Sequence, residues 1–229
     1  MFKDNKKAER MHESIRGIVA EKLDTLTFDG PLRMYTRPDK VDFAALGCEK
    51  TAVFLGISDT DRSSDRLVNL FYAQALHALC VSADKDYPDH RLPVPVRFIL
   101  DDFAANAELP DFDKIISVVR SREISVSIIL QSLSQLSAIY GKDRAKTIVN
   151  NCDHILYLGG MDVDTAQYIS YLANKIVDSI INMPLDAAYL FTRGARPRMV
   201  RKYDLRSHPL YHALRESHRE PQDLSIEPA

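Results

Sequence analysis

Short apolar segments alternate with amphipathic segments along most of this chain, and that alternation limits its possible folds more than any other feature. Apolar runs of strand length occur at residues 51–57, 96–100, 125–132 and 154–160. Segments with helical spacing of apolar residues lie between and after them, at residues 65–83, 111–123, 133–141, 143–152 and 162–177. This repetition predicts an α/β protein with a mostly parallel sheet. Runs at 187–194 and 198–204 predict two final strands, joined as a hairpin around residues 195–197.

The overall composition is that of an ordinary globular protein. The 229 residues are 45% hydrophobic and 27% charged, and a net charge of -2 gives no general attraction to nucleic acid or to a membrane. The three cysteines are widely spaced and form no Cys-x-x-Cys pair, which argues against a zinc site or a disulfide framework. No apolar run approaches the roughly 18 residues that span a bilayer. We therefore expect a cytoplasmic chain.

Polar residues follow several of the predicted strands directly. Asp101 and Asp102 come after residues 96–100, Gln131 ends the next strand, and Gly159 follows the one after that. In a parallel sheet these residues would gather at one edge, where open α/β sheets bind ligands. Two adjacent carboxylates repel each other, so they hold a metal, handle a proton or cap a turn. Together with an amide and a glycine pair, they suit a magnesium-phosphate site.

Several long segments, taken in order, resemble the motor domain of the TraG family of type IV secretion coupling proteins. The similarity is carried by "FILDDFAANAELPDFDKIISVVRSREISVSIILQSLSQLSAIYG" and "IVNNCDHILYLGG". It extends upstream through "EKTAVFLGISDTDRSSDRLVNLFYAQALHAL" and downstream through "TRGARPRMVRKYDLRSHPLY", covering about residues 45–212. The resemblance implies a RecA-like core with a helical insertion before Glu49, and the activity of a conjugative, DNA-translocating ATPase.

The resemblance also implies roles for individual residues. Asp101 and Asp102 match the Walker B pair, with Asp101 orienting magnesium through water, and Gln131 matches the glutamine that senses the γ-phosphate. Gly159 joins these three in the expected nucleotide contact. Arg120 matches an arginine that reaches the nucleotide of a neighbouring subunit, and Arg122 is the alternative, since a guanidinium fits phosphate geometry and stays charged. Without the resemblance, a solvated helix face explains both arginines.

Departures from the family pattern limit what the chain can do alone. The phosphate-binding loop G-x-x-x-x-G-K-[ST] is absent; the Gly141-Lys142 pair is followed by Asp143 and preceded by Leu136 where the first glycine should stand. Asp102 replaces the family's glutamate, and the stretch between Asn174 and Met183 is short. We therefore expect an incomplete RecA-like fold that lacks the Walker A half and binds Mg and ATP only in a complete assembly. Whether this chain is itself an enzyme stays open.

The predicted organisation has three parts. Residues 1–47 are a helical segment and linker, matching the end of the family's all-alpha insert; residues 48–210 are the half-motor domain; and residues 211–229 are a polar tail. The implied partners are full-length coupling-protein subunits, a relaxase or other secreted substrate, DNA and the secretion channel, which would hold the chain at the inner face of the membrane. The alternative is a nucleotide-independent module that assembles with a full-length coupling protein. An unrelated magnesium-dependent hydrolase ranks last, because no nucleophile–base arrangement accompanies the aspartates.

A basic cluster lies near the end of the predicted sheet, in the sequence "RGARPRMVRKYDLR". Such a cluster can contact DNA phosphates, but Tyr203 is its one aromatic residue available for stacking. A charged edge strand, which resists aggregation, explains the same pattern. We favour the second interpretation.

Overall fold

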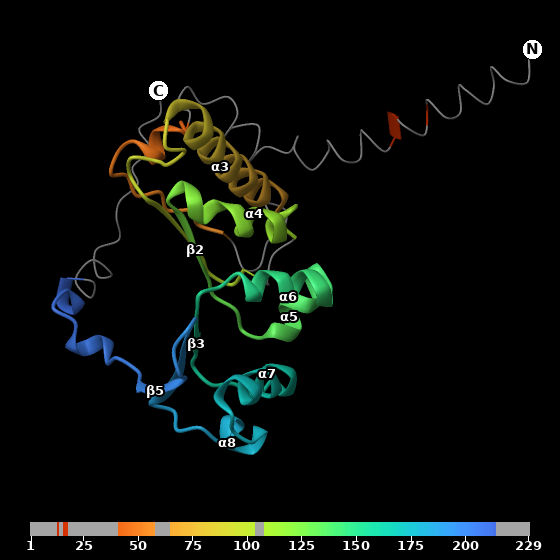
Figure 1. Cartoon of the computed structure of the whole chain (residues 1–229), viewed down its shortest axis with the longest axis vertical. Coiled ribbons are helices and arrows are strands. Elements are labelled where there is room, and N and C mark those ends of the chain that lie inside the picture. The colour runs from red at the N-terminus through yellow and green to blue at the C-terminus, as the bar shows by residue number, and fades with distance from the viewer. Residues whose placement is uncertain (1–12, 14–15, 18–40, 58–64, 104–107, 214–229) are drawn as a thin grey trace, which may run out of the picture. The chain divides into compact units, whose positions relative to one another are not determined.

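The computed structural model describes residues 13, 16–17, 41–57, 65–103 and 108–213 of the chain. Internal contacts divide it into two compact units, Met1–Cys152 and Asp153–Ala229 (Figure 1). Most of the predicted segment 1–47 and of the predicted tail 211–229 lies outside the described residues, so both stay predictions.

The first unit is built on a parallel pair of strands, β1 (Val96–Leu100) and β2 (Ile124–Ile128). Their register pairs Leu100 with Ile128, so the two strands end at the same level. The helices of this unit are η1 (Ala45–Gly47), α3 (Asp65–Asp86), α4 (Phe112–Val118), η3 (Val119–Arg122), α5 (Leu133–Tyr140) and α6 (Lys142–Asn150). The predicted helices at 65–83, 111–123, 133–141 and 143–152 are confirmed within a few residues.

A single hydrophobic core holds the first unit together. Leu79 of α3, Phe112 of α4, Leu136 of α5 and Ile148 of α6 all lie in it with almost no exposed surface. Leu100 joins them, whereas its neighbour Ile99 is 65% exposed, because successive strand residues point to opposite faces. The described helices therefore cover one face of the β1–β2 pair.

The strand predicted at residues 51–57 is wrong. These residues form no regular element, and Phe54 is 93% exposed. A strand exists only where a neighbour supplies hydrogen bonds to its backbone, and among the described residues none pairs with this segment. An apolar, β-branched composition is therefore a necessary condition for a strand and not a sufficient one.

The second unit contains an antiparallel sheet in the order β3 (His154–Tyr157), β4 (Ala187–Thr192), β5 (Arg198–Arg201). The predicted hairpin is confirmed by the pairing of β4 with β5. The prediction of a mostly parallel sheet is wrong for this unit, because β3 also pairs with β4 in the antiparallel direction. Two helices connect β3 to β4. Those helices are α7 (Val163–Ala173) and α8 (Val177–Ile181), and η4 (Leu205–Ser207) follows the sheet.

The core of the second unit lies between the sheet and α7 and α8, which Figure 1 shows beside it. Tyr189 and Phe191 stack with ring centroids 6.0 Å apart on the inner face of β4. Ala166 and Ile169 of α7 and Ile180 of α8 pack in the same cluster. α7 begins as the sequence predicts, because the carboxylate of Asp162 accepts a hydrogen bond from Thr165 N–H at 2.9 Å.

Candidate functional site

The ends of β1 and β2 bring three of the predicted site residues together. Asp101 and Asp102 form the turn that leaves β1, and Gln131 follows β2. The amide Nε2 of Gln131 donates a hydrogen bond to Oδ1 of Asp102 at 3.2 Å. All three side chains are exposed. The parallel register thus places an acid pair and an amide at the same edge of the strand pair.

The backbone at this edge is tightly constrained. Ile129 N–H donates to the carbonyl of Leu100 at 2.9 Å, and Phe103 N–H donates back to the carbonyl of Ile129 at 3.2 Å. Between them, Asp102 adopts a left-handed conformation with φ 46°, which short polar residues such as Asp tolerate better than most. Oδ1 of Asp101 accepts a hydrogen bond from Asp102 N–H at 3.1 Å. This turn aims the Asp102 carboxylate at Gln131.

A second amide supports Gln131, and the sequence reasoning missed it. Nε2 of Gln135 donates to Oε1 of Gln131 at 3.2 Å, and Gln135 N–H donates to the hydroxyl of Ser132, which caps α5. Gln131 precedes the N-cap Ser132 and Gln135 lies in the first turn of α5, so helical spacing alone does not predict this contact. The two hydrogen bonds that link Gln135 to Gln131 and Gln131 to Asp102 fix which end of the Gln131 amide group faces the acid pair.

Gly159 belongs to the second unit, whereas Asp101, Asp102 and Gln131 belong to the first. Gly159 has φ 97°, a conformation that favours glycine, and a Cβ at this position would meet the methyl carbon of Met183 at 3.6 Å. Its expected contact with the same nucleotide as Asp101 stays a prediction.

The donor set suits a magnesium ion that also binds phosphate. No group of three or more His, Cys, Asp or Glu side chains with metal-binding geometry occurs among the described residues. Magnesium, however, is commonly held by one or two carboxylates together with substrate phosphates and waters. Asp101 and Asp102 are exposed and can provide those carboxylates. The sequence itself has no phosphate-binding loop with its lysine beside these carboxylates.

The two candidate arginines have different surroundings. Arg122 donates from Nε and Nη2 to both oxygens of Asp84 on α3, at 3.0 and 2.9 Å, and it also donates to the carbonyl of Val118. Hydrogen bonding to Asp84 accordingly raises the pKa of Arg122. This bidentate pair ties η3 to α3, so the guanidinium of Arg122 is committed within the first unit.

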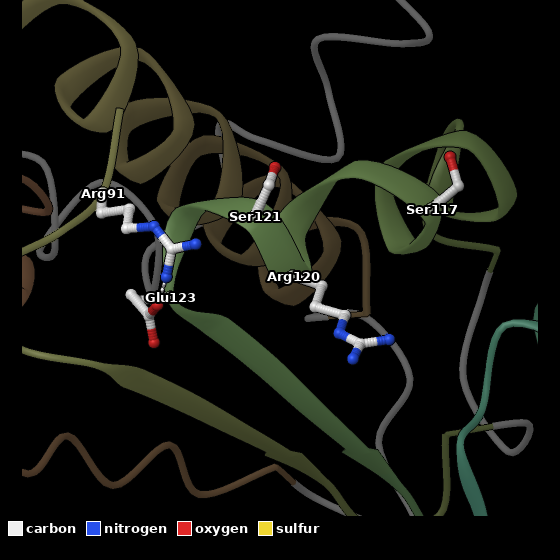
Figure 2. Close-up of a pocket in the computed structure, with 5 residues that line it drawn as sticks. All are labelled: Arg91, Ser117, Arg120, Ser121 and Glu123. Carbon is white, nitrogen blue, oxygen red and sulfur yellow. Dashed lines mark hydrogen bonds and ion pairs between the residues drawn. The ribbon is translucent and has the colours of Figure 1, made fainter. Parts of the chain in front are cut away.

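Arg120 instead lines a surface hollow of about 530 Å³, together with Arg91, Ser117, Ser121 and Glu123. Figure 2 shows its guanidinium extending from η3 on the side opposite the hydroxyl of Ser121. Arg91 forms an ion pair with Glu123 at the same hollow. Arg120 thus lies at the wall of a hollow that is open to the surface.

Aromatic packing anchors the residues that follow the acid pair. Phe103 stacks on Tyr140 with a centroid distance of 5.7 Å, and Phe112 packs against both rings. The hydroxyl of Tyr140 accepts a hydrogen bond from Leu109 N–H at 2.9 Å. Arg144 lies over the Tyr140 ring and pairs with Asp113 and Glu108. These contacts hold Phe103 and Leu109 in the core of the first unit. The sequence analysis predicted none of them.

Comparison with known proteins supports the resemblance seen in the sequence. Residues 95–175, which include Asp101, Asp102, Arg120 and Gln131, match the family model TraG-D_C, described as the TraM recognition site of TraD and TraG. The chain carries a TraG/TraD-type domain. It is also 25% identical over 178 residues to Protein VirD4 of Rhizobium rhizogenes and 26% identical to Protein VirD4 of Agrobacterium fabrum. Each match covers 72% of this chain and 26% of the relative.

Solved structures of a coupling protein share the fold of part of this chain. The bacterial conjugative coupling protein TrwB, as TrwBdeltaN70, matches with a TM-score of 0.53 at 18% identity, over 62% of this chain and 37% of that chain. TrwB in complex with a non-hydrolysable ATP analogue, ADPNP, matches with a TM-score of 0.50 at 20% identity, over 60% and 37%. The chain thus spans 26% of the length of the VirD4 relatives and 37% of the TrwB chains. Within the described residues, no helix has the length and apolar character needed to cross a membrane.

Proposed function

We propose that this chain contributes part of the nucleotide site of a type IV coupling-protein motor and acts only within a larger assembly. The observation that supports this most directly is the hydrogen bond from Gln131 to Asp102 at the ends of parallel strands. It joins an acid and an amide inside the segment that matches TraG-D_C. Phosphoryl transfer relies on positioning and charge, and acids and amides of this kind supply the positioning.

Each side chain has a distinct part in the proposed site. Asp101 orients a magnesium ion through water, and Asp102 holds the proton-accepting carboxylate near the attacking water. Gln131 positions that water, and Gln135 fixes the Gln131 amide through its own hydrogen bond. When bound, Mg-ATP supplies the transferable phosphoryl group. In TrwB a bound ATP analogue has been observed, which supports a nucleotide as the ligand of a complete assembly.

The isolated chain should not hydrolyse ATP, because it lacks the phosphate-binding loop. Charge-assisted hydrogen bonds contribute about 1.5–3 kcal/mol each, so losing a lysine and several backbone donors weakens binding by orders of magnitude. Calorimetric titration of the purified chain with Mg-ATP should show no binding at micromolar concentrations, and phosphate release should match buffer. Tight binding, or turnover that Asp101→Ala abolishes, would refute the proposal.

Arg120 is the residue proposed to act on a neighbouring subunit's nucleotide. Arg122, whose guanidinium binds both oxygens of Asp84, is the alternative. The test mixes this chain with the full-length coupling protein of the same organism and measures ATPase activity. Arg120→Ala should lower the activity of the mixture and leave co-purification intact, and Arg120→Lys should not restore it, because lysine lacks the fork geometry. Unchanged activity with Arg120→Ala would remove this role.

A second candidate function is a nucleotide-independent module that assembles with a full-length coupling protein. Two observations favour it: the sequence has no phosphate-binding loop, and the matched family model is described as a recognition site. The double variant Asp101→Asn/Gln131→Ala separates the two functions. If it still co-purifies with the coupling protein and supports normal ATPase activity of the mixture, the module explains the chain better.

The proposed partners follow from the relationship to coupling proteins. They are coupling-protein subunits, a relaxase or other secreted substrate, DNA and the secretion channel, and these contacts would hold the chain at the inner face of the membrane. Cross-linking in cells, followed by identification of the linked proteins, tests this set. Recovery of this chain without any coupling protein or channel component would contradict it.

A further inference from the structure

A dense row of positive charge lies at one edge of the second unit's sheet, and the proposed nucleotide site does not use it. Between Arg193 and Arg206 the sequence has six cationic side chains and one acidic side chain, although the whole chain has a net charge of -2. The cations are Arg193, Arg196, Arg198, Arg201, Lys202 and Arg206. Most of this segment is strand β5 and the turn that leads into it.

β5 is an edge strand with an open side. Among the described residues β4 is its one neighbour. Lys202 N–H donates to the carbonyl of Asp186 at 2.7 Å, so Lys202 turns its backbone groups toward β4. Residues of an antiparallel strand alternate in this respect. Met199 and Arg201 therefore direct their N–H and C=O groups away from β4, toward the open side.

Side chains along this edge are exposed and mixed in character. Met199 is 56% exposed and Tyr203 is 67% exposed, and the Arg201 side chain is 90% exposed. The nearest acidic partner of Arg201 is Asp186 at 4.0 Å, the outer limit of an ion pair, whereas Arg193 is held by Asp153 at 2.9 Å. The edge thus combines free backbone groups, apolar surface and weakly compensated cations.

These properties select one kind of partner. A second copy of this strand would bring like charges together, which is how charged edges prevent self-association. A nucleic acid can bind the cations, but it does not form the hydrogen bonds of a β-ladder with the backbone of β5. Tyr203 is the one exposed aromatic residue of the segment, so base stacking has little support here. An extended peptide with acidic residues can use the cations, the backbone groups and the apolar surface together.

We propose that β5 is the docking edge for an extended acidic segment of a partner protein, which adds to the sheet as a strand beside β5. Its backbone pairs with Met199 and Arg201, and its carboxylates meet Arg198, Arg201 and Lys202. This interaction is independent of the nucleotide site, so it can hold whether or not the chain belongs to an ATPase.

Fluorescence anisotropy with defined probes tests this proposal. The main probe is a fluorescein-labelled peptide of strand length, about ten residues, built of paired glutamates and paired threonines so that both of its faces carry carboxylates. A matched peptide carries N-methyl groups on the residues of one edge, which keeps the charge but removes the donors. A lysine–threonine peptide and an oligo-dT strand complete the set. We expect the unmodified acidic peptide to bind best, and the N-methylated peptide to bind at least about tenfold more weakly.

Variants of the full chain locate the binding surface. Arg198→Gln/Arg201→Gln should weaken binding of the acidic peptide about fivefold, as two exposed charge pairs predict. The matched control Lys85→Gln/Lys142→Gln removes the same charge from exposed positions of the first unit and should leave binding unchanged. Met199→Pro removes one outward N–H without touching the ladder to β4, and it should weaken binding while the circular dichroism spectrum is retained.

Three results would overturn the proposal. Equal binding of the N-methylated and unmodified peptides would show that charge alone acts. Tighter binding of oligo-dT than of the acidic peptide would make the edge a nucleic-acid surface. Equal losses in the β5 variant and in the Lys85/Lys142 control would move the site away from β5. The comparison of the two peptides uses the unaltered chain, so it decides the question even if Met199→Pro fails to fold.

Discussion

Replacing Tyr140 with phenylalanine removes one oxygen atom from the core of the first unit. That oxygen accepts the hydrogen bond from Leu109 N–H at 2.9 Å, and both residues are almost fully buried, with 4% and 1% exposure. The ring itself, stacked on Phe103, stays in Tyr140→Phe. The variant therefore leaves a buried N–H group without its acceptor and changes little else.

The size of the effect follows from that unsatisfied donor. A buried polar group deprived of its partner costs about 1–3 kcal/mol, and we expect Tyr140→Phe to lower the free energy of unfolding by that amount. Tyr140→Leu also removes the aromatic contacts to Phe103 and Phe112, each worth about 0.5–1.5 kcal/mol beyond area burial, and should cost more. Tyr171→Phe is the control, since Tyr171 is 86% exposed; its change should stay within about 0.5 kcal/mol.

Tyr140 also makes the free energy of unfolding depend on pH in the alkaline range. Burial raises the pKa of Tyr140 from 10.0 to about 12, although the hydrogen bond from Leu109 N–H opposes the rise. A group whose pKa is higher in the folded state stabilises that state below the unfolded pKa and loses the contribution as the pH rises through the folded pKa. Stability should therefore fall by about 2–3 kcal/mol between pH 10 and 12 in the parent chain. Tyr140→Phe should lack this part of the decline.

Urea denaturation measures both effects. Melts followed by circular dichroism at pH 7 give the loss for each variant, and a series up to pH 12 gives the slope difference between parent and Tyr140→Phe. The m-value should not change, because the variant exposes no new surface when it unfolds. If Tyr140→Phe is as stable as Tyr171→Phe at neutral pH, Leu109 N–H has another acceptor and the reasoning is refuted.

Two further perturbations test the ion pairs of the first unit. Arg122→Ala should lower the urea midpoint more than Arg120→Ala, because it breaks the bidentate pair that ties η3 to Asp84; a larger loss with Arg120→Ala would reverse our assignment of the two arginines. Hydrogen bonds from Arg144 lower the pKa of Asp113, so their stabilisation is present above the unfolded pKa of about 3.9 and disappears as the pH falls through the lower folded value. Arg144→Gln should make the urea midpoint less dependent on pH below about 4, and an unchanged acid dependence would contradict this linkage.

The sequence predicted the parts of the fold that depend on local pattern. Amphipathic spacing identified α3, α5, α6 and α7, and either Asp162 or Asp164 was expected near the start of α7; the structure has Asp162 as its N-cap, which acts within a few residues. The hairpin β4–β5 followed from two apolar runs with a turn between them. Asp111 shows the limit of the same reasoning: it precedes α4, but it has φ 53°, and its carboxylate pairs with Lys114 rather than capping the helix.

Pairing between distant segments could not be read from local pattern. Apolar composition says nothing about whether a strand runs parallel or antiparallel to its neighbour, so β3 was assigned to the wrong kind of sheet. It also could not show that residues 51–57 lack a strand partner among the described residues. At the candidate site, Asp101, Asp102 and Gln131 were predictable because strand ends collect at one edge. The Asp84–Arg122 pair joins residues 38 positions apart, and no sequence period links them.

The left-handed turn at Asp102 has a consequence for how this site could change during evolution or engineering. The resemblance to the TraG family implies a glutamate at this position, and Asp102→Glu introduces that longer side chain in one step. That step, however, places a residue less tolerant of the left-handed region at φ 46°, where ordinary L-residues are disfavoured by about 1–2 kcal/mol. It also moves the carboxylate one methylene farther from the backbone, so the 3.2 Å hydrogen bond from Gln131 cannot keep its present geometry. Recovery of a glutamate here therefore requires the turn to relax as well, so side-chain length and backbone shape at this position must change together.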